Sequence, residues 1–273
     1  MQNHLIVIWV KVIRRLFLSV RPASPSRMLA LLPNPQHRPL VLVCDTSQQA
    51  CSVALALPDG SIIERLEETG RGHTEKLPLM IADILTSSSV GLKDVERLGV
   101  TIGPGTFAGV RVGLAAMRAI RISHQLPIYA ITTTHAIVLP VQQIAGGNEE
   151  RQSIVVIDAR RGELYCQIFD AQGVPISDAM AHTAKGLVEI IEKQGITRPN
   201  IIGSGAEILA AQMQTDDLTC LEMPFWPQAG LIAEWVARQE AIMENTPPPE
   251  PLYLRPPDAA LPSASSYLTR LER

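Results

Sequence analysis

The chain has 273 residues, enough for one large domain or two smaller ones, and its apolar fraction of 46% can fill a core. Aromatic residues make up only 4%, which argues against a surface that stacks nucleic-acid bases. The net charge is −3, but residues 1–27 hold five basic and no acidic residues, so the remainder has 19 basic against 27 acidic residues. We expect such an acidic body to bind RNA poorly by itself.

Residues 1–39 differ in composition from the rest of the chain. An apolar start is interrupted by Lys11, Arg14 and Arg15, and five prolines follow. The longest apolar run is far below the ~18 residues that a membrane span needs, so no membrane association is expected. The lack of acids resembles a transit peptide and the apolar start a signal peptide. We favour a disordered extension that results from an over-extended gene start, with Met28 as the initiator.

The next segment predicts three strands and a helix. Apolar runs at 41–47 and 51–57 indicate strands, and the Pro-Asp-Gly-Ser turn at 58–61 joins the second strand to a third at 61–67. An amphipathic helix follows Gly72 and His73, with Thr74 as its predicted N-cap. The apolar stripe of this helix consists of Leu77, Met80, Ile81, Ile84 and Leu85. A turn with a short helix begins at Gly91.

A glycine-rich block at 98–113 is the most informative stretch. The apolar run at 98–102 predicts a buried strand, the Gly-Pro-Gly-Thr sequence at 103–106 a tight turn, and the residues after it a helix. Backbone N–H groups at such a turn can cradle an anion or a phosphate. The block lacks the Lys-Ser/Thr ending of a P-loop and the spacing of a dinucleotide-binding motif. The alternative is a strand-to-helix connection that packs closely through Gly109 and Gly113.

A repeat divides the chain. Residues 154–170 mirror residues 41–57, because each is an apolar strand that ends in aspartate, a polar turn and a returning strand. Asp45 and Asp158 hold equivalent places. The duplication predicts two related halves. We place the first lobe at 40–145, a smaller second lobe at 150–256 and a flexible tail at 257–273.

The remaining elements are predicted from shorter patterns. We expect strands at 127–131 and 200–205, and helices at 133–143, 187–193, 206–213 and 229–245. The proline-rich run at 247–251 predicts a stiff linker. Residues 252–255 then predict an edge strand or a docking tail.

Side chains that commonly carry catalysis are sparse. None of the six histidines lies four residues from another, which excludes the HExxH and HxxxH metal motifs, and there is no Gly-x-Ser-x-Gly sequence. The four cysteines have apolar neighbours and no CxxC spacing, so we interpret them as reduced core thiols of a cytosolic protein. We expect His73 to contact a ligand or a partner, or to be a surface residue at a helix start. The Arg160-Arg161 turn predicts an anion contact, a contact with an acidic partner or a solvated hairpin tip.

Several blocks occur in an order that one family shares. They are Asp45-Thr46-Ser47 with 51–55, Gly72-His73, and the segments 103–113, 158–165 and 251–255. Over about residues 40–256 the chain resembles the TsaB (YeaZ) family, the non-catalytic subunits of the bacterial tRNA threonylcarbamoyladenosine machinery. The family motif usually reads Gly-Pro-Gly-Ser-Phe-Thr-Gly. Thr106 keeps the first hydroxyl, whereas Ala108 lacks the second, so no side-chain hydrogen bond is expected from position 108.

The resemblance implies an α/β fold of the actin-like and sugar-kinase-like (ASKHA) kind, with two lobes and a reduced second lobe. It implies a cytoplasmic scaffold rather than an enzyme, which forms a heterodimer with the catalytic paralogue TsaD. TsaE joins this complex, and tRNA is reached through it when threonylcarbamoyl is transferred to the adenosine beside the anticodon. No metal or cofactor is required by this chain, although ATP or ADP can lie at or near the partner interface. A homodimer in isolation is left open.

The resemblance also implies two sets of site residues. The nucleotide- or phosphate-like pocket comprises Asp45, Thr46, Ser47, Gly103, Gly105, Thr106 and Asp158. The partner interface comprises His73, Leu77, Met80, Arg111 and Arg118. Arg111 and Arg118 lie seven residues apart and share a helix face, which can equally be a solvated face. Two alternatives remain: a stand-alone ATP-binding enzyme that uses Asp45 and Asp158 and, less favoured, a peptidase.

Overall fold

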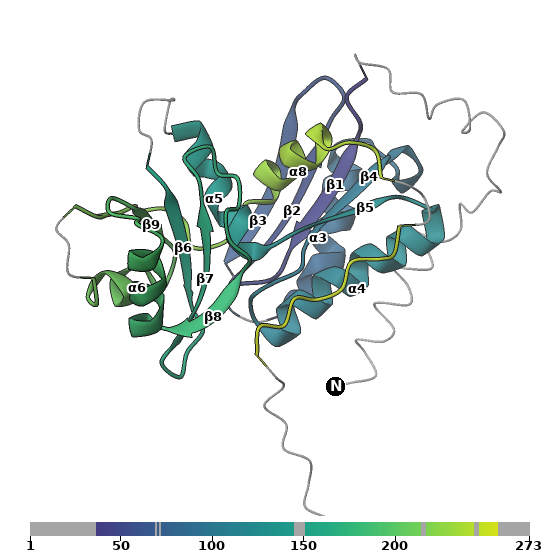
Figure 1. The fold of residues 1–273 in the computed structure, drawn as a ribbon. Helices are drawn as coiled ribbons and strands as arrows, with labels where there is room; N and C mark the ends of the chain where they lie inside the picture. The colour runs from purple at the N-terminus through teal and green to yellow at the C-terminus, as the bar shows by residue number, and fades with distance from the viewer. Residues whose placement is uncertain are drawn as a thin grey trace, which may run out of the picture.

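The computed structural model describes residues 37–68, 70, 72–144, 151–213, 217–242 and 246–255. Nearly all of the predicted extension at 1–39 and the whole tail at 257–273 therefore lie outside the described residues. The strands form two five-stranded sheets, ordered β3-β2-β1-β4-β5 and β10-β9-β6-β7-β8. The two sheets lie next to each other, each with helices on its faces (Figure 1).

The first sheet holds the Gly-rich block. Its strands are β1 (Val41–Asp45), β2 (Ala50–Ala56), β3 (Ile62–Glu68), β4 (Arg97–Thr101) and β5 (Ile128–Ile131). Its helices are α3 (His73–Ser87), the 3-10 helix η1 (Leu92–Asp94), α4 (Phe107–His124) and α8 (Ala229–Arg238). β1 pairs antiparallel with β2 and parallel with β4.

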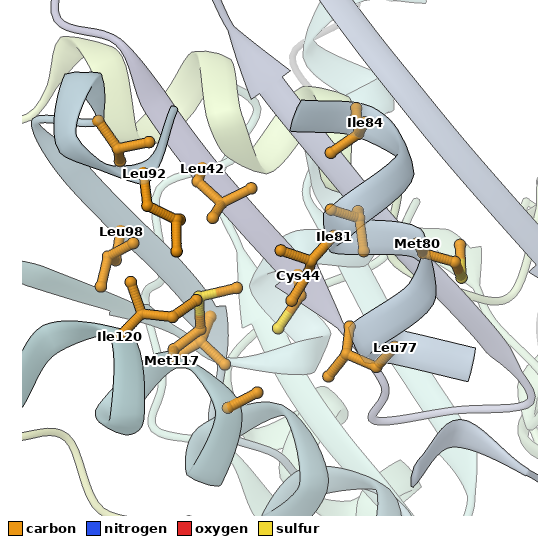
Figure 2. Packing of buried hydrophobic residues seen from close by; sticks show 14 of the residues in the cluster. Leu42, Cys44, Leu77, Met80, Ile81, Ile84, Leu92, Leu98, Met117 and Ile120 are labelled. Atoms are coloured by element: carbon orange, nitrogen blue, oxygen red, sulfur yellow. The ribbon is translucent and has the colours of Figure 1, made fainter. Parts of the chain in front are cut away.

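The side chains of β1 alternate between the two faces of the first sheet, and each face has its own hydrophobic cluster. Leu42 and Cys44 belong to a buried cluster with α3 and α4, which Figure 2 shows from close by. Val41 and Val43 point to the opposite face, where they pack with α8. Side chains of a strand alternate between the two faces, so a strand covered by helices on both faces is buried along its whole length. This is observed for β1 and β2.

The second sheet repeats the first. Its strands are β6 (Ser153–Asp158), β7 (Glu163–Phe169), β8 (Met180–Thr183), β9 (Asn200–Ile202) and β10 (Thr219–Cys220), and its helices are α5 (Thr133–Ile144), α6 (Ala184–Lys193) and α7 (Ala206–Ala210). β6 pairs antiparallel with β7 and parallel with β9, as β1 pairs with β2 and β4. The predicted fold class, a duplicated α/β fold of the actin-like and sugar-kinase-like kind, is confirmed.

Some predicted elements differ from the structure. The short strands β8 and β10 were not predicted, because they have four and two residues and no apolar alternation. α3 begins at His73 rather than after Thr74, with Gly72 as N-cap at a φ of 88°. α8 ends at Arg238 rather than at residue 245, and the Arg97 guanidinium donates to the carbonyl oxygens of Val236 (3.0 Å) and Gln239 (2.7 Å) at its end.

The last part of the chain returns to the first sheet. α8 and residues 246–255 were placed in the second lobe, but α8 packs on β1 and β2, and residues 246–255 run along α4 (Figure 1). The other lobe boundaries remain a prediction. Within the described ranges, no helix is long and apolar enough to cross a membrane.

Candidate functional site

Asp45 ends β1 and is the centre of a buried polar turn. Its Oδ1 accepts hydrogen bonds from the backbone N–H (3.1 Å) and hydroxyl (2.6 Å) of Ser47 and from the hydroxyl of Thr101. The residue is 0% exposed, and Oδ2 has no hydrogen-bond partner among the residues that the structure describes. Burial raises the pKa of Asp45 to about 6, although the hydrogen bonds from Ser47 and Thr101 act in the opposite direction.

The glycines of the Gly-rich block bring backbone against backbone. A Cβ atom would lie 2.3 Å from the Ser47 carbonyl oxygen at Gly105 and 2.0 Å from the Thr46 carbonyl oxygen at Gly109. The Thr106 N–H donates to Ser47 O (2.8 Å), and the Thr46 hydroxyl donates to Gly109 O (2.7 Å). These glycines therefore have the close-packing role that the sequence left open. A phosphate cradle at this turn remains a prediction.

Gly103 is also enclosed by backbone. It has a φ of 107°, and a Cβ there would lie 2.9 Å from the carbonyl oxygen of Leu252. Its own carbonyl oxygen accepts from the N–H of Thr133 (2.7 Å), whose buried hydroxyl has no partner within the described part of the chain. β1, β4 and β5 are parallel, so Asp45 and Thr133 both follow carboxyl ends at one edge of the sheet. Asp45 and Thr133 thus each place a buried oxygen without a partner among the described residues at this edge of the sheet, whereas backbone fills the space at the glycines.

Asp158 ends β6 in the place equivalent to Asp45, but it is exposed. Its Oδ1 accepts from the N–H of Arg160 (2.7 Å), and its N–H donates to the hydroxyl of Ser204 (3.0 Å). Arg160 and Arg161 have φ values of 61° and 58°, a conformation that side chains other than glycine rarely adopt. Each aspartate thus closes its own turn, and a shared role in holding a nucleotide remains a prediction.

The first predicted interface residues lie on α3, and two of them are core residues. Leu77 is 0% and Met80 6% exposed, and both point into the cluster beneath the first sheet (Figure 2). The prediction that they contact a partner is wrong, because the sheet covers the apolar stripe. His73 is 9% exposed, its Nε2 lies 3.1 Å from the carbonyl oxygen of Gln48, and burial lowers its pKa.

The predicted interface arginines of α4 contact the chain itself. Arg111 Nε donates to the hydroxyl of Tyr253 (2.7 Å), and its guanidinium lies 3.3 Å from the ring centroid of Phe107. Arg118 donates to the carbonyl oxygen of Pro249. Arg111 is exposed and Arg118 is half-buried on this face of α4, and both contact residues 246–255 of the same chain. Their contact with a partner remains a prediction.

Two exposed apolar residues were missed by the sequence interpretation. Leu79 on α3 is 56% exposed and Ile122 on α4 is 78% exposed. Neither belongs to the apolar stripe of its helix. A large apolar residue outside the apolar stripe of a helix was the sequence signal that could have identified them as exposed.

The four cysteines differ in their burial. Cys44, Cys51 and Cys166 are buried free thiols, whereas Cys220 is exposed, so the prediction of a core thiol is wrong for Cys220. Burial raises the pKa of Cys51 and of Cys166 to about 12. The buried thiols are therefore protonated at neutral pH.

Comparison with known proteins identifies a matching family and similar relatives. The family described as "TsaD: tRNA N6-adenosine threonylcarbamoyltransferase" matches residues 66–220, more than half of the chain. The tRNA threonylcarbamoyladenosine biosynthesis protein TsaB of Escherichia coli (strain K12) is 35% identical over 125 residues, which are 46% of this chain and 52% of that protein. The TsaB of Haemophilus influenzae is also 35% identical over 125 residues, 46% of this chain and 51% of that protein. The chain spans about half the length of these two relatives.

Solved structures give the same fold. A Pseudomonas aeruginosa protein described as similar to peptidase YEAZ matches with a TM-score of 0.64 and 23% identity, over 80% of this chain and 100% of that chain. YeaZ from Pseudomonas aeruginosa matches with a TM-score of 0.62 and 22% identity, over 73% of this chain and 90% of that chain. At these identities the likeness is one of fold.

Proposed function

The chain belongs to the family described as TsaD, tRNA N6-adenosine threonylcarbamoyltransferase, and resembles TsaB; from this premise we propose that it is a non-catalytic scaffold subunit of tRNA modification. In this role it binds the catalytic paralogue TsaD as a heterodimer in the cytoplasm. TsaE joins the pair, and tRNA is reached through the complex. The chain supports the transfer of threonylcarbamoyl to the adenosine beside the anticodon without supplying a catalytic residue.

Two exposed apolar side chains on the outer faces of α3 and α4 support this proposal. Ile122 is 78% and Leu79 56% exposed, and both helices cover the same face of the first sheet. Ala115 is exposed on α4, and Ala119 is half-buried there. We propose that these side chains belong to one contact surface, because contiguous exposed apolar patches are typical of protein interaction sites. This corrected interface replaces Leu77 and Met80 by Leu79 and Ile122.

The double variant Leu79→Glu/Ile122→Glu in the full chain tests the interface. We expect TsaD binding to weaken by at least about a hundredfold, because two carboxylates would lose water in the contact. tRNA threonylcarbamoylation by a mixture of this chain, TsaD and TsaE should fall accordingly. Co-purification and the modification assay, with each protein omitted in turn, measure both effects.

Ile208→Glu is the matched control, since Ile208 is 46% exposed on α7 of the second sheet. The control should bind TsaD normally, and all variants should keep the thermal stability of the parent. Normal binding and modification by the double variant would contradict the proposed interface. Loss of a homodimer in the double variant, seen by size-exclusion chromatography, would show that the same face serves self-association.

The unsatisfied Oδ2 of Asp45 favours one alternative, a stand-alone ATP-binding enzyme. ATP hydrolysis by the purified chain alone, abolished by Asp45→Asn, would replace the scaffold role by an enzyme role. We expect no hydrolysis above background and no difference between parent and Asp45→Asn. Binding of ATP or ADP near the partner interface remains compatible with a scaffold, and a peptidase stays the less favoured alternative.

A further inference from the structure

Residues 246–255, which we call the C-terminal strap, run along α4 without regular secondary structure (Figure 1, in yellow). Four of its ten residues are prolines, which keep the segment extended and lack an N–H to donate. Carbonyl oxygens of this segment accept hydrogen bonds from arginines of α4. Arg121 donates to the carbonyl oxygen of Thr246 (2.5 Å), and Arg118 donates to that of Pro249.

The strap continues over the end of the first sheet. The rings of Tyr253 and Phe107 lie 5.5 Å apart, with the Arg111 guanidinium over Phe107. The Leu252 N–H donates to the carbonyl oxygen of Ile102 (2.7 Å), directly after β4. The strap is thus bound to the first half of the molecule through its own carbonyl oxygens, the ring of Tyr253 and the N–H of Leu252.

The last residue of the strap reaches the second sheet. Arg255 donates to the carbonyl oxygen of Ala159 and, through Nε, to the hydroxyl of Tyr165 (3.2 Å). It also forms an ion pair with Glu163 (3.3 Å), and its side chain is only 24% exposed. All three partners belong to the hairpin of β6 and β7. A single ten-residue segment is therefore bound to both sheets.

A second connection between the sheets lies at α5. Ala136 and Leu139 of this helix belong to the cluster on the first sheet, whereas Ile137 and Val138 belong to the cluster on the second. One connection of this kind leaves a pivot about which the sheets can rotate. A second attachment away from the pivot removes this freedom, and the strap supplies it through the contacts of the Arg255 side chain with the second sheet.

We propose that the C-terminal strap is a latch that fixes the second sheet relative to the first, with α5 as the pivot and Arg255 as the positioning residue. The latch is a property of the chain alone and does not depend on the proposed scaffold function. It fixes where the second sheet lies relative to the outer face of α3 and α4. Release of Arg255 frees the second sheet without unfolding either sheet.

Distances between spin labels on the two sheets test the latch in the full chain. Labels at Thr86→Cys on α3 and Glu189→Cys on α6 occupy exposed positions, and Cys220→Ser removes the exposed native thiol. We expect one narrow distance distribution for the labelled parent. Arg255→Ala should widen this distribution at least about twofold, because additional orientations become populated.

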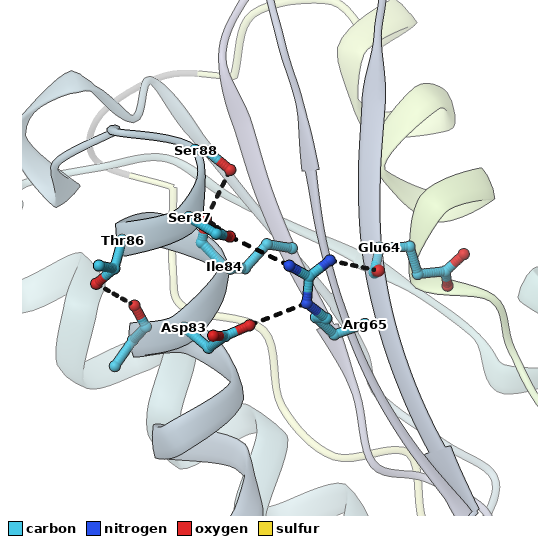
Figure 3. Close-up of polar contacts among 8 residues, drawn as sticks. Glu64, Arg65, Asp83, Ile84, Thr86, Ser87 and Ser88 are labelled. Carbon is cyan, nitrogen blue, oxygen red and sulfur yellow. Dashed lines mark hydrogen bonds and ion pairs between the residues drawn. The ribbon is translucent and has the colours of Figure 1, made fainter.

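Arg65→Ala is the matched control. Like Arg255, Arg65 binds a carboxylate, a hydroxyl and a carbonyl oxygen, but its partners Asp83 (2.9 Å), Ser87 (3.2 Å) and Glu64 (3.2 Å) all belong to the first half (Figure 3). Its loss should leave the distribution narrow. If Arg255→Ala and the control give the same narrow distribution, the latch is refuted.

A second variant approaches the same contact from the other sheet. Glu163→Gln combined with Tyr165→Phe removes two partners of Arg255 and leaves the strap sequence unchanged. The distribution should widen again, and the Leu252 amide should exchange its hydrogen about tenfold faster than in the parent. Unchanged width and exchange in this variant would overturn the proposal even if Arg255→Ala failed to fold.

Discussion

At the scale of residues, Asp45 and Asp158 show how far a local motif determines chemistry. Both end a strand and accept a hydrogen bond from the N–H two residues later. Only Asp45 is buried, because the turn after it is enclosed by the Gly-rich block, and Leu252 lies against Gly103 at the same edge of the sheet. The equivalence of the two places was predictable from the repeat. Their different burial was not, since it depends on residues that are distant along the chain, from Thr101 to Leu252.

The pKa of Asp45 predicts a pH dependence of stability. A pKa of about 6 in the folded state, against 3.8 in the unfolded state, means that the folded state holds the proton more tightly. The contribution of Asp45 to the free energy of unfolding should therefore fall as the pH rises from about 4 to about 6, by about 3 kcal/mol in total. Above about pH 7 it should stay constant.

Urea unfolding of the parent and of Asp45→Asn at a series of pH values measures this effect. Subtracting one curve from the other cancels the other titrating groups. A difference that does not change between pH 4 and pH 7 would show that the carboxylate has an ordinary pKa.

Gly109 predicts a steric effect. A Cβ there would lie 2.0 Å from the Thr46 carbonyl oxygen, so Gly109→Ala must push α4 away from the turn after β1. We expect a loss of more than ~3 kcal/mol in the free energy of unfolding. Gly195→Ala is the control, since it has open space and only a φ of 71° to oppose a side chain, at a cost of about 1–2 kcal/mol. Equal losses in urea titrations would contradict the close-packing role of Gly109.

At the scale of elements, α3 shows what an apolar stripe can predict. The stripe correctly indicated a helix and its buried face. It could not tell core from interface, because both require apolar residues at the same spacing. Leu77 and Leu79 are two residues apart, yet one is fully buried and the other 56% exposed. The stripe separates these two leucines, but the sequence does not show whether the stripe faces the sheet or a partner.

The N-terminus of α4 gives an element-scale prediction. The Thr106 hydroxyl accepts from the N–H of Gly109 (3.2 Å), and Thr106 is the N-cap. Thr106→Ala should lower the free energy of unfolding by about 1 kcal/mol, whereas Thr106→Ser keeps the acceptor and should change it by only a few tenths. Chemical denaturation distinguishes the two. If serine destabilises as much as alanine, the cap contributes through its methyl group instead.

At the scale of the whole molecule, the duplication could be predicted from the sequence, whereas the way in which the two sheets are connected could not. Two hairpins, each with a first strand that ends in aspartate, predicted two related sheets. Both sheets have the same strand order and directions. The places of α5 and α8 could not be predicted. Each has an apolar stripe that fits either sheet, and contacts distant in sequence decide which sheet it covers.

The two-sided burial of α5 predicts that the sheets unfold together. Ile137 is 2% exposed in the cluster of the second sheet, while Leu139 of the same helix lies in the cluster of the first. Ile137→Ala should therefore lower the free energy of unfolding by about 2–4 kcal/mol and weaken the protection of amides in both sheets. Native-state hydrogen exchange at Val43 and Val155 measures one sheet each. Loss of protection at Val155 alone would indicate independent unfolding.

The return of α8 to the first sheet has a consequence for synthesis on the ribosome. Val41, Val43 and Ala54 on β1 and β2 are covered by α8, which is translated after both sheets. The face that they form stays open while the second half emerges, and exposed apolar strands of this kind are a target of chaperones during translation. The half that is translated first is therefore the half that is completed last.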